Sequence, residues 1–145
     1  MIRAEDINIA LGERIDESLK EAGIPTTRRR PDDNSEMHRR SIQINLEGLH
    51  IEPQGSFRSL VQDVAIYFYP ADADQPRDEI WLAAMAIETA FSEPLIVDGA
   101  VLRLADEVYV DMSSIDIAEI TLQLTWIETA EITAETVETI ETEVN

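Results

Sequence analysis

Hydrophobic positions near the start of the chain recur with the period of an α-helix. Four aliphatic side chains are spaced four residues apart: Ile7, Leu11, Ile15 and Leu19. Charged residues fill the positions between them, so the pattern predicts an amphipathic helix over residues 5–22. Asp6 is the expected N-cap, and Gly23 followed by Pro25 predicts the end of the helix.

Two later stretches alternate between hydrophobic and polar residues, as half-buried strands do. The first begins at Ser41, and Gly48 predicts its end. The second covers residues 120–126, in the sequence ITLQLTW. Residues 59–69 lie between them, and the second half of this stretch is hydrophobic on both sides, as expected of a central strand.

A second helix and a hairpin are expected between these strands. Pro76 suits the first turn of a helix and Pro94 ends it. The predicted buried stripe of this helix has these members: Ile80, Ala84, Ile87 and Phe91, widened by Trp81 and Met85. Asp98 and Gly99 separate two hydrophobic runs and both tolerate positive φ, so they predict a tight hairpin whose second strand continues to Val110.

This order of elements predicts an α+β fold. The strands form antiparallel pairs with helices between them, so the expected packing is a mostly antiparallel sheet with two helices packed on one face. We expect a single domain over residues 1–128. The last segment, 129–145, is rich in Thr and Glu and has no basic residue, which predicts a tail that is mobile or ordered by a partner.

Residues 26–40 hold five of the eleven basic residues: Arg28, Arg29, Arg30, Arg39 and Arg40. The centre of the segment consists of turn-forming residues, which predicts an exposed loop between the first helix and the first strand. Three functions are open for this loop: contact with nucleic acid, a solvated surface, or a subunit or partner interface with an acidic surface.

The overall charge bears on that choice. Thirty acidic and eleven basic side chains give a formal net charge of −19, which repels phosphate backbones and disfavours nucleic-acid binding over the whole surface. The longest hydrophobic run, IWLAAMAI, is far shorter than the roughly 20 residues that span a bilayer. The start of the chain lacks the hydrophobic region of a signal peptide, so we expect a soluble protein with no membrane partner. The absence of cysteine favours an intracellular protein.

Motifs of enzymes and of cofactor sites are missing from the sequence. There is no glycine-rich phosphate loop, no nucleophile elbow and no histidine pair at metal spacing. Asp72, Asp74 and Asp78, near the second helix, are better explained by the helix dipole than by a calcium site. Asp106 and Glu107 lie in a predicted strand or bulge and have no identifiable partner base. Tyr67, Tyr69 and Trp126 are expected to pack in a core or an interface. We therefore expect no enzyme, no catalytic residue, no metal and no cofactor.

The layout as a whole resembles a known family. An amphipathic helix, a polar excursion, a strand, the aromatic strand VAIYFYP, an acidic gap, a helix, the hairpin LIVDGAVLRLADEVYVD and the strand ITLQLTWIET occur in this order. This order, over roughly residues 3–128, is similar to that of the tail terminator or tail-completion proteins of long-tailed phages and phage-tail-like particles. The resemblance lies in element order and strand character, and no signature residue carries it.

The resemblance implies a structural virion protein of the tail and neck region, assembled in the host cytoplasm. It implies a homo-oligomeric ring, usually a hexamer, that caps the head-proximal end of the tail tube, ends its polymerisation and presents the head-tail joining surface. The implied partners are the tail tube protein, the head-tail connector and, in a contractile tail, the sheath, with DNA only as passing cargo. In this interpretation Arg28, Arg29, Arg30, Arg39 and Arg40 form a subunit or partner interface.

Two other functions stay open at this point. The chain also resembles the small acidic chaperones of type III secretion, which bind an unfolded effector as dimers; residues 131–144 would then form their final helix. A third alternative is an enzyme subunit or nuclease accessory that uses the arginine cluster on phosphate.

Overall fold

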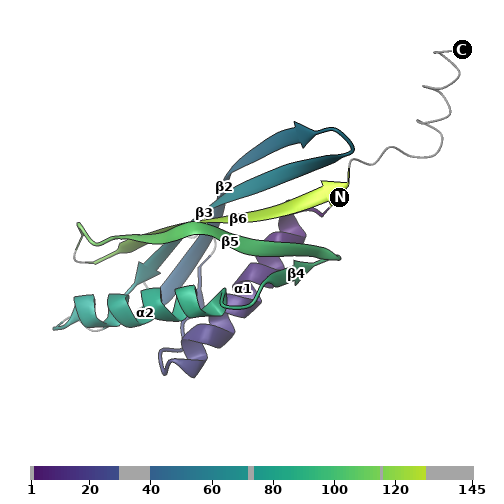
Figure 1. The fold of residues 1–145 in the computed structure, drawn as a ribbon. Coiled ribbons are helices and arrows are strands. Elements are labelled where there is room, and N and C mark those ends of the chain that lie inside the picture. Colours follow the sequence, from purple (N-terminus) through teal and green to yellow (C-terminus); the bar gives the residue numbers. More distant parts are fainter. Residues whose placement is uncertain (1, 30–39, 72–73, 115, 130–145) are drawn as a thin grey trace, which may run out of the picture.

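The computed structural model describes residues 2–29, 40–71, 74–114 and 116–129. Two helices and six strands follow one another along these residues (Figure 1). Their bounds are α1 Ala4–Glu21, β1 Thr27–Arg28, β2 Ser41–Gln54, β3 Phe57–Tyr69, α2 Pro76–Ala90, β4 Leu95–Val97, β5 Ala100–Asp111 and β6 Ala118–Thr129. The expected α+β fold is confirmed.

The six strands form one sheet in the order β1-β2-β3-β6-β5-β4. The short strand β1 pairs with β2 in parallel, and every other neighbouring pair is antiparallel. The long strands β3 and β6 occupy the centre, as the hydrophobic character of residues 59–69 predicted. The sheet is therefore mostly antiparallel, as expected from the order of elements.

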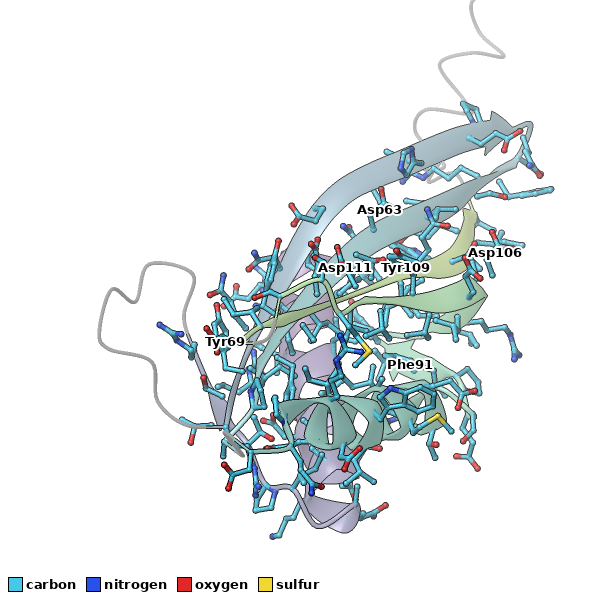
Figure 2. All side chains as sticks on the ribbon, turned by 90° about the vertical axis from the view of Figure 1, so that its left-hand side faces the viewer. Asp63, Tyr69, Phe91, Asp106, Tyr109 and Asp111 are labelled. Atoms are coloured by element: carbon cyan, nitrogen blue, oxygen red, sulfur yellow. The ribbon has the colours of Figure 1, made fainter. Side chains whose placement is uncertain are left out.

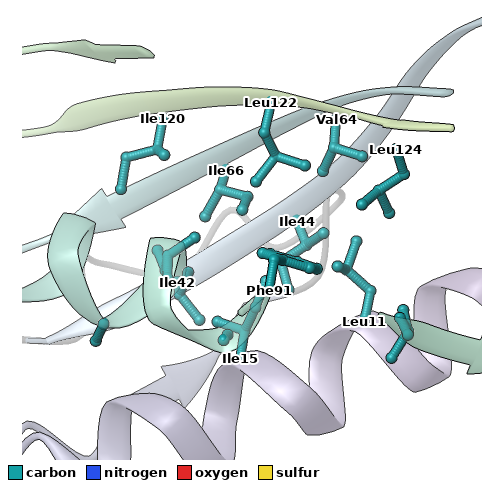
Figure 3. Packing of buried hydrophobic residues seen from close by; sticks show 14 of the residues in the cluster. Leu11, Ile15, Ile42, Ile44, Val64, Ile66, Phe91, Ile120, Leu122 and Leu124 are labelled. Carbon is teal, nitrogen blue, oxygen red and sulfur yellow. The ribbon is translucent and has the colours of Figure 1, made fainter. Parts of the chain in front are cut away.

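One face of the sheet carries the core, and both helices lie against it (Figures 1 and 3). The strands contribute the side chains of alternate positions to this face: Ile42, Ile44, Leu60, Val64, Ile66, Phe68, Ile120, Leu122, Leu124 and Trp126. The helices contribute Ile7, Leu11, Ile15, Leu19, Ile80, Ile87 and Phe91. Because the period of a strand is two, the side chains between these positions point to the opposite face, which neither of the described helices covers and which we call the open face.

Helix α1 begins earlier than the sequence predicted. Its N-cap is Arg3, and Asp6 is the third helical residue, where its carboxylate accepts a hydrogen bond of 3.4 Å from the backbone N–H of Arg3. Asp6 therefore stabilises the first turn from inside the helix and not as the N-cap. Gly23 has a φ of +83°, which confirms the left-handed residue expected after the helix.

Strand β2 does not end at Gly48. Glu47 and Gly48 together lie opposite Asp63, which is a one-residue bulge, and pairing with β3 continues to Gln54. A second irregularity lies in β5 between Ala105 and Tyr109. These bulges bend the two long strands on either side of the central pair β3 and β6.

Helix α2 and the residue after it bury most of the predicted stripe, because Ile80, Ile87 and Phe91 belong to the core. The buried side chains of the helix itself are those of Glu79, Ile80, Ala83, Ala86, Ile87 and Ala90. Trp81 and Met85 are 63% and 59% exposed, so the prediction that they widen the buried stripe is wrong. The hairpin at Asp98 and Gly99 is confirmed, with φ of +48° and +84° at these residues.

No helix among the described residues is long and apolar enough to cross a membrane. Residues 30–39, which make up most of the expected basic loop, and residues 130–145 of the expected acidic tail lie outside the described residues.

Candidate interaction site on the open face of the sheet

The arginines of the basic segment contact the body of the domain where the structure describes them. Arg28 lies in β1 and places its guanidinium over Gly12 of α1, where a side-chain Cβ would overlap the Arg28 Nη1 atom. Burial raises the pKa of Asp16, on the same helix, and the positive charge of Arg28 lowers it in part. Glycine at position 12 therefore leaves room for a cation on the surface of α1.

Arg29 and Arg40 contact other elements. The Arg29 guanidinium carbon lies 4.7 Å from the centre of the Tyr69 ring at the end of β3, a cation–π distance. The Arg40 Nε donates a hydrogen bond of 2.6 Å to Oε1 of Glu79, a carboxylate that is 5% exposed. Arg30 and Arg39 lie outside the described residues. The three described arginines of the predicted interface thus contact three different parts of the chain: α1, the end of β3 and the first turn of α2.

The open face is hollowed at its centre. The hollow has a volume of about 670 Å³. Five carboxylates from four strands line it: Glu47, Asp63, Asp106, Glu107 and Glu119. Figure 2 shows Asp63, Asp106 and Tyr109 on one side of the sheet, away from Phe91 and the helices. We call this feature the acidic hollow.

The two bulges shape the acidic hollow. Glu47 belongs to the bulge of β2, and Asp106 and Glu107 belong to the irregular stretch of β5. Asp106 adopts a φ of +55°, a left-handed conformation that aspartate tolerates better than most residues. Because a bulge re-aims the side chains of its strand, it brings carboxylates from both outer strands toward the central pair.

Asp63 is the best-held carboxylate of the acidic hollow. Its Oδ2 atom lies 2.9 Å from Nε2 of His50, and its Oδ1 atom accepts a hydrogen bond of 2.7 Å from Nε2 of Gln123. The hydrogen bonds from His50 and Gln123 hold the pKa of Asp63 below its ordinary value. Asp63 is therefore ionised whenever the protein is near neutral pH.

The neighbouring phenol responds in the opposite direction. Burial, and then the negative charges of Glu119 and Glu47, raise the pKa of Tyr67. No group of side chains that could hold a metal ion is found in the described parts of the chain. The chemistry of the acidic hollow is thus that of a negative surface that repels phosphate and attracts cations.

Exposed hydrophobic side chains lie on both layers of the domain. On the outer surface of α2 they are Trp81, Leu82 and Met85, which we call the α2 patch. On the open face, Ile96 pairs with Val101, and Ile127 pairs with Ser59 near the same end of the sheet. Ile96 and Ile127 are each 65% exposed. Patches of this kind mark surfaces that meet other molecules.

The sequence did not reveal the acidic hollow. Its members come from four strands and gather only because two bulges bend the outer strands. The pair Asp106 and Glu107 was placed in a strand or bulge, and this proved correct. The signal for Glu47 in the sequence is Gly48, the glycine that follows it, but this glycine predicted the end of a strand and not a bulge.

Comparison with known proteins gives a likeness of structure. No family model matches the chain, and no curated protein matches its sequence. A chain in the virion of a native gene transfer agent particle has a similar structure, with a TM-score of 0.55 and 13% identity; the match covers 80% of this chain and 92% of that one. A second solved chain, which carries no descriptive name, matches with a TM-score of 0.51 and 8% identity over 90% of this chain and 99% of that one. At these identities the comparisons establish a shared fold.

Proposed function

We propose that this chain is a structural protein of a phage-like virion, where it forms a ring on the head-proximal end of the tail tube. The observation that carries the proposal is the fold shared with a chain of a gene transfer agent virion, which extends over 92% of that chain. The order of elements, similar to that of tail terminator proteins, supports the same function. Neither observation depends on a single residue.

The proposed mechanism is structural and requires no catalytic residue, metal or cofactor. A ring of six copies covers the last ring of tube subunits and removes the surface to which another tube subunit would add. Its opposite side then meets the head-tail connector, and its rim can hold the end of a sheath in a contractile tail. Such a ring assembles in the host cytoplasm and stays in the neck of the virion.

The surfaces of the domain suit a ring. A ring that lies between the tail tube and the head-tail connector needs a different surface for each of these partners, in addition to the heterologous contacts between its own copies. The helical layer presents the α2 patch and the opposite layer presents the acidic hollow with Ile96 and Ile127 beside it. A negative surface repels the phosphates of DNA, which favours DNA as passing cargo over DNA as a bound partner.

The function is tested by adding the purified protein to tail tubes that are polymerising from purified tube protein. We expect binding at one end of each tube, seen by electron microscopy, and an end to elongation at that end. A protein that leaves tube length unchanged and binds no tube end would contradict the proposal. A strict dimer that binds unfolded polypeptide would instead identify a secretion chaperone, and mass photometry measures that state directly.

A further inference from the structure

We propose that copies of this chain join edge to edge, with the free edge of β2 in one copy paired to the free edge of β5 in the next. The contact places Ile51 opposite Leu104 and Glu52 opposite Arg103. This inference deepens the ring described above and rests on that proposal for its biological role. The contact itself depends only on the topology and the side chains of the sheet.

The first free edge belongs to β2. On its outer side β2 is paired only at its start, where Ser41 and Ile42 lie beside Thr27 and Arg28 of β1. No other described strand pairs with this side of β2 as it continues to Gln54. An unpaired edge of this length presents a row of backbone N–H and C=O groups whose natural ligand is another extended strand.

The second free edge belongs to β5. Strand β4 pairs with β5 only from Ala100 to Leu102. Beyond Leu102 no described strand pairs with the outer side of β5, which continues to Asp111. Among the described residues the sheet therefore has two different free edges on its opposite sides, as a heterologous contact requires.

The directions of the strands fit such a contact. Three antiparallel steps separate β2 from β5, so the two strands run in opposite directions. A second copy placed beside the first, with its open face on the same side, therefore presents its β5 antiparallel to the β2 edge. No copy has to be turned over, so the same step can repeat around a ring.

The hydrogen-bonding pattern selects which residues can face each other. The C=O of Ile42 accepts a hydrogen bond of 2.7 Å from the N–H of Arg29, so the backbone groups of Ile42 point outward. Along a strand, every second residue points its backbone N–H and C=O to the same edge. Before the bulge these residues have even numbers, such as Ile42. The extra residue in the bulge at 47–48 shifts the alternation by one, so after the bulge Leu49 and Ile51 point their backbone groups to the free edge.

The backbone groups of β5 also alternate between the two sides of the strand. In the two-residue hairpin at Asp98 and Gly99, Val97 and Ala100 are the pair that exchanges hydrogen bonds. Ala100 and Leu102 therefore point their backbone groups toward β4, and Leu104 points its groups to the free edge. Ile51 and Leu104 are thus positioned to exchange two backbone hydrogen bonds across the contact.

The side chains agree with this register. Ile51 and Leu104 lie on the helix side of the sheet, because Ile51 pairs with buried Leu60 and Leu104 with buried Leu124. Ile51 is 48% exposed within one copy, although it lies on the side that elsewhere carries the core. A neighbouring Leu104 would cover it, which explains a hydrophobic side chain left open at an edge.

The charges agree as well. In the register that pairs Ile51 with Leu104, the adjacent residues are Glu52 and Arg103, and both belong to the open face. Each is exposed, and neither forms an ion pair with a residue that the structure describes. They occupy a pair without backbone hydrogen bonds, where opposing side chains come closest. An opposite-charge pair at such a position stabilises two antiparallel strands.

The ends of the contact are set by the chain. At one end, Pro53 has no N–H to donate. In the proposed register Pro53 lies opposite Leu102, whose backbone groups already pair with β4. The irregular stretch of β5 that begins at Asp106 limits the contact on the other side. Strand β1 covers the start of β2 and β4 covers the start of β5, and these two starts lie at opposite ends of the sheet. Neighbouring copies are therefore shifted relative to each other along the strand direction, and such a shift tilts the strands as in a closed barrel.

The absence of cysteine makes a cross-linking test clean. A Glu52→Cys/Arg103→Cys double variant should form, on mild oxidation, a ladder of disulfide-linked multimers that ends at the closed ring. A mixture of the two single variants should give mainly the mixed dimer. The matched control is a Glu13→Cys/Glu88→Cys double variant, in which both positions are exposed on the helices; it should give no ladder.

Charge exchange tests the register independently. Glu52→Arg or Arg103→Glu alone places like charges opposite each other and should weaken self-association about tenfold. The double exchange should restore most of the loss, while thermal stability of the three variants stays unchanged.

Several results would overturn the inference. One is a disulfide yield between positions 52 and 103 that is no higher than in the control variant. Another is a single variant that links to a second copy of itself as often as the two positions link to each other. Absence of any association or linkage would do the same. If tubes are capped without this linkage, the edge contact fails and the proposed function stands. If the linkage forms in a protein that ignores tubes, the contact stands and the function fails.

Discussion

Arg40 and Glu79 connect the start of β2 to the first turn of α2 at one end of the sheet. The Arg40 Nε lies 2.6 Å from Oε1 of Glu79, and the same carboxylate accepts hydrogen bonds from the backbone N–H of Ala71. Glu79 belongs to the first turn of α2, whereas Arg40 directly precedes β2 and Ala71 follows β3. A residue that the sequence placed at the end of an exposed loop is thus bound to a buried carboxylate.

We expect Glu79→Ala to lower the free energy of unfolding by about 2 kcal/mol. The substitution removes the carboxylate that accepts hydrogen bonds from Arg40 and from the backbone N–H of Ala71. The expected decrease is smaller than for a fully buried ion pair, because the Arg40 side chain is 31% exposed. Urea denaturation measures the change. Glu88→Ala, at an exposed position of the same helix, is the control, and an equal effect of the two variants would show that the pair is dispensable.

The acidic hollow gives a prediction for pH. The pKa of Asp63 lies below its ordinary value of 3.8 because His50 and Gln123 donate hydrogen bonds to its carboxylate. This stabilisation is present above the ordinary pKa and is lost as the pH falls through the lower pKa of the folded state.

Gln123→Ala should therefore raise the pKa of Asp63, which carboxyl NMR titration measures. It should also lower the free energy of unfolding by about 1 kcal/mol near neutral pH, the net contribution of one such hydrogen bond. The difference from the wild type should shrink as the pH falls through the Asp63 pKa. A loss of the same size at all pH values would show that Gln123 acts through packing alone.

A substitution at Gly12 should increase the free energy of unfolding, in contrast to the substitutions above. Alanine favours a helix interior over glycine by about 1 kcal/mol, but its Cβ would displace the guanidinium of Arg28. Because Arg28 is flexible and exposed, we expect Gly12→Ala to raise the free energy of unfolding, by at most about 1 kcal/mol.

The same variant should raise the pKa of Asp16 further, because the positive charge that lowers it moves away. Arg28→Ala is the control: it should raise the Asp16 pKa without the gain in stability. A Gly12→Ala variant that is markedly less stable than the wild type would mean that Arg28 is fixed against α1.

Two neighbours on α2 should separate stability from assembly. Ile80 is 1% exposed, so Ile80→Ala should cost about 2 to 4 kcal/mol of folding free energy. Trp81 is 63% exposed, so Trp81→Ala should change stability by less than about 0.5 kcal/mol. If the α2 patch is a partner surface, Trp81→Ala should weaken binding to tube ends while its melting temperature stays that of the wild type. Unchanged tube binding would remove the α2 patch from the contact.

Local patterns predicted most of the fold. The spacing of Ile7, Leu11 and Ile15 is a signal within one element, and so is the turn chemistry of Asp98 and Gly99, whose positive φ values confirm it. Ile80, Ile87 and Phe91 of the α2 stripe were predicted correctly, but its width was overestimated, because Trp81 and Met85 are hydrophobic at helical spacing and the sequence does not show how far the sheet covers the helix.

The candidate site was harder to predict because it depends on irregular pairing. A glycine such as Gly48 is typical of a turn. Only the pairing of the strands, in which Glu47 and Gly48 lie opposite Asp63, shows that it belongs to a bulge. The free edges of β2 and β5 follow from the strand order, which brings β6 between β3 and β5. The basic segment gave a clear composition signal, but its contacts with Tyr69 and Glu79 required tertiary structure.

The central claim is that this chain ends the tail of a phage-like virion. It is tested most directly by deleting the gene in the organism that makes the particles and imaging the purified products by electron microscopy. We expect tail tubes of unregulated length and no joined heads, with both defects reversed when the gene is restored. Particles with joined heads and tails of normal length would contradict the account.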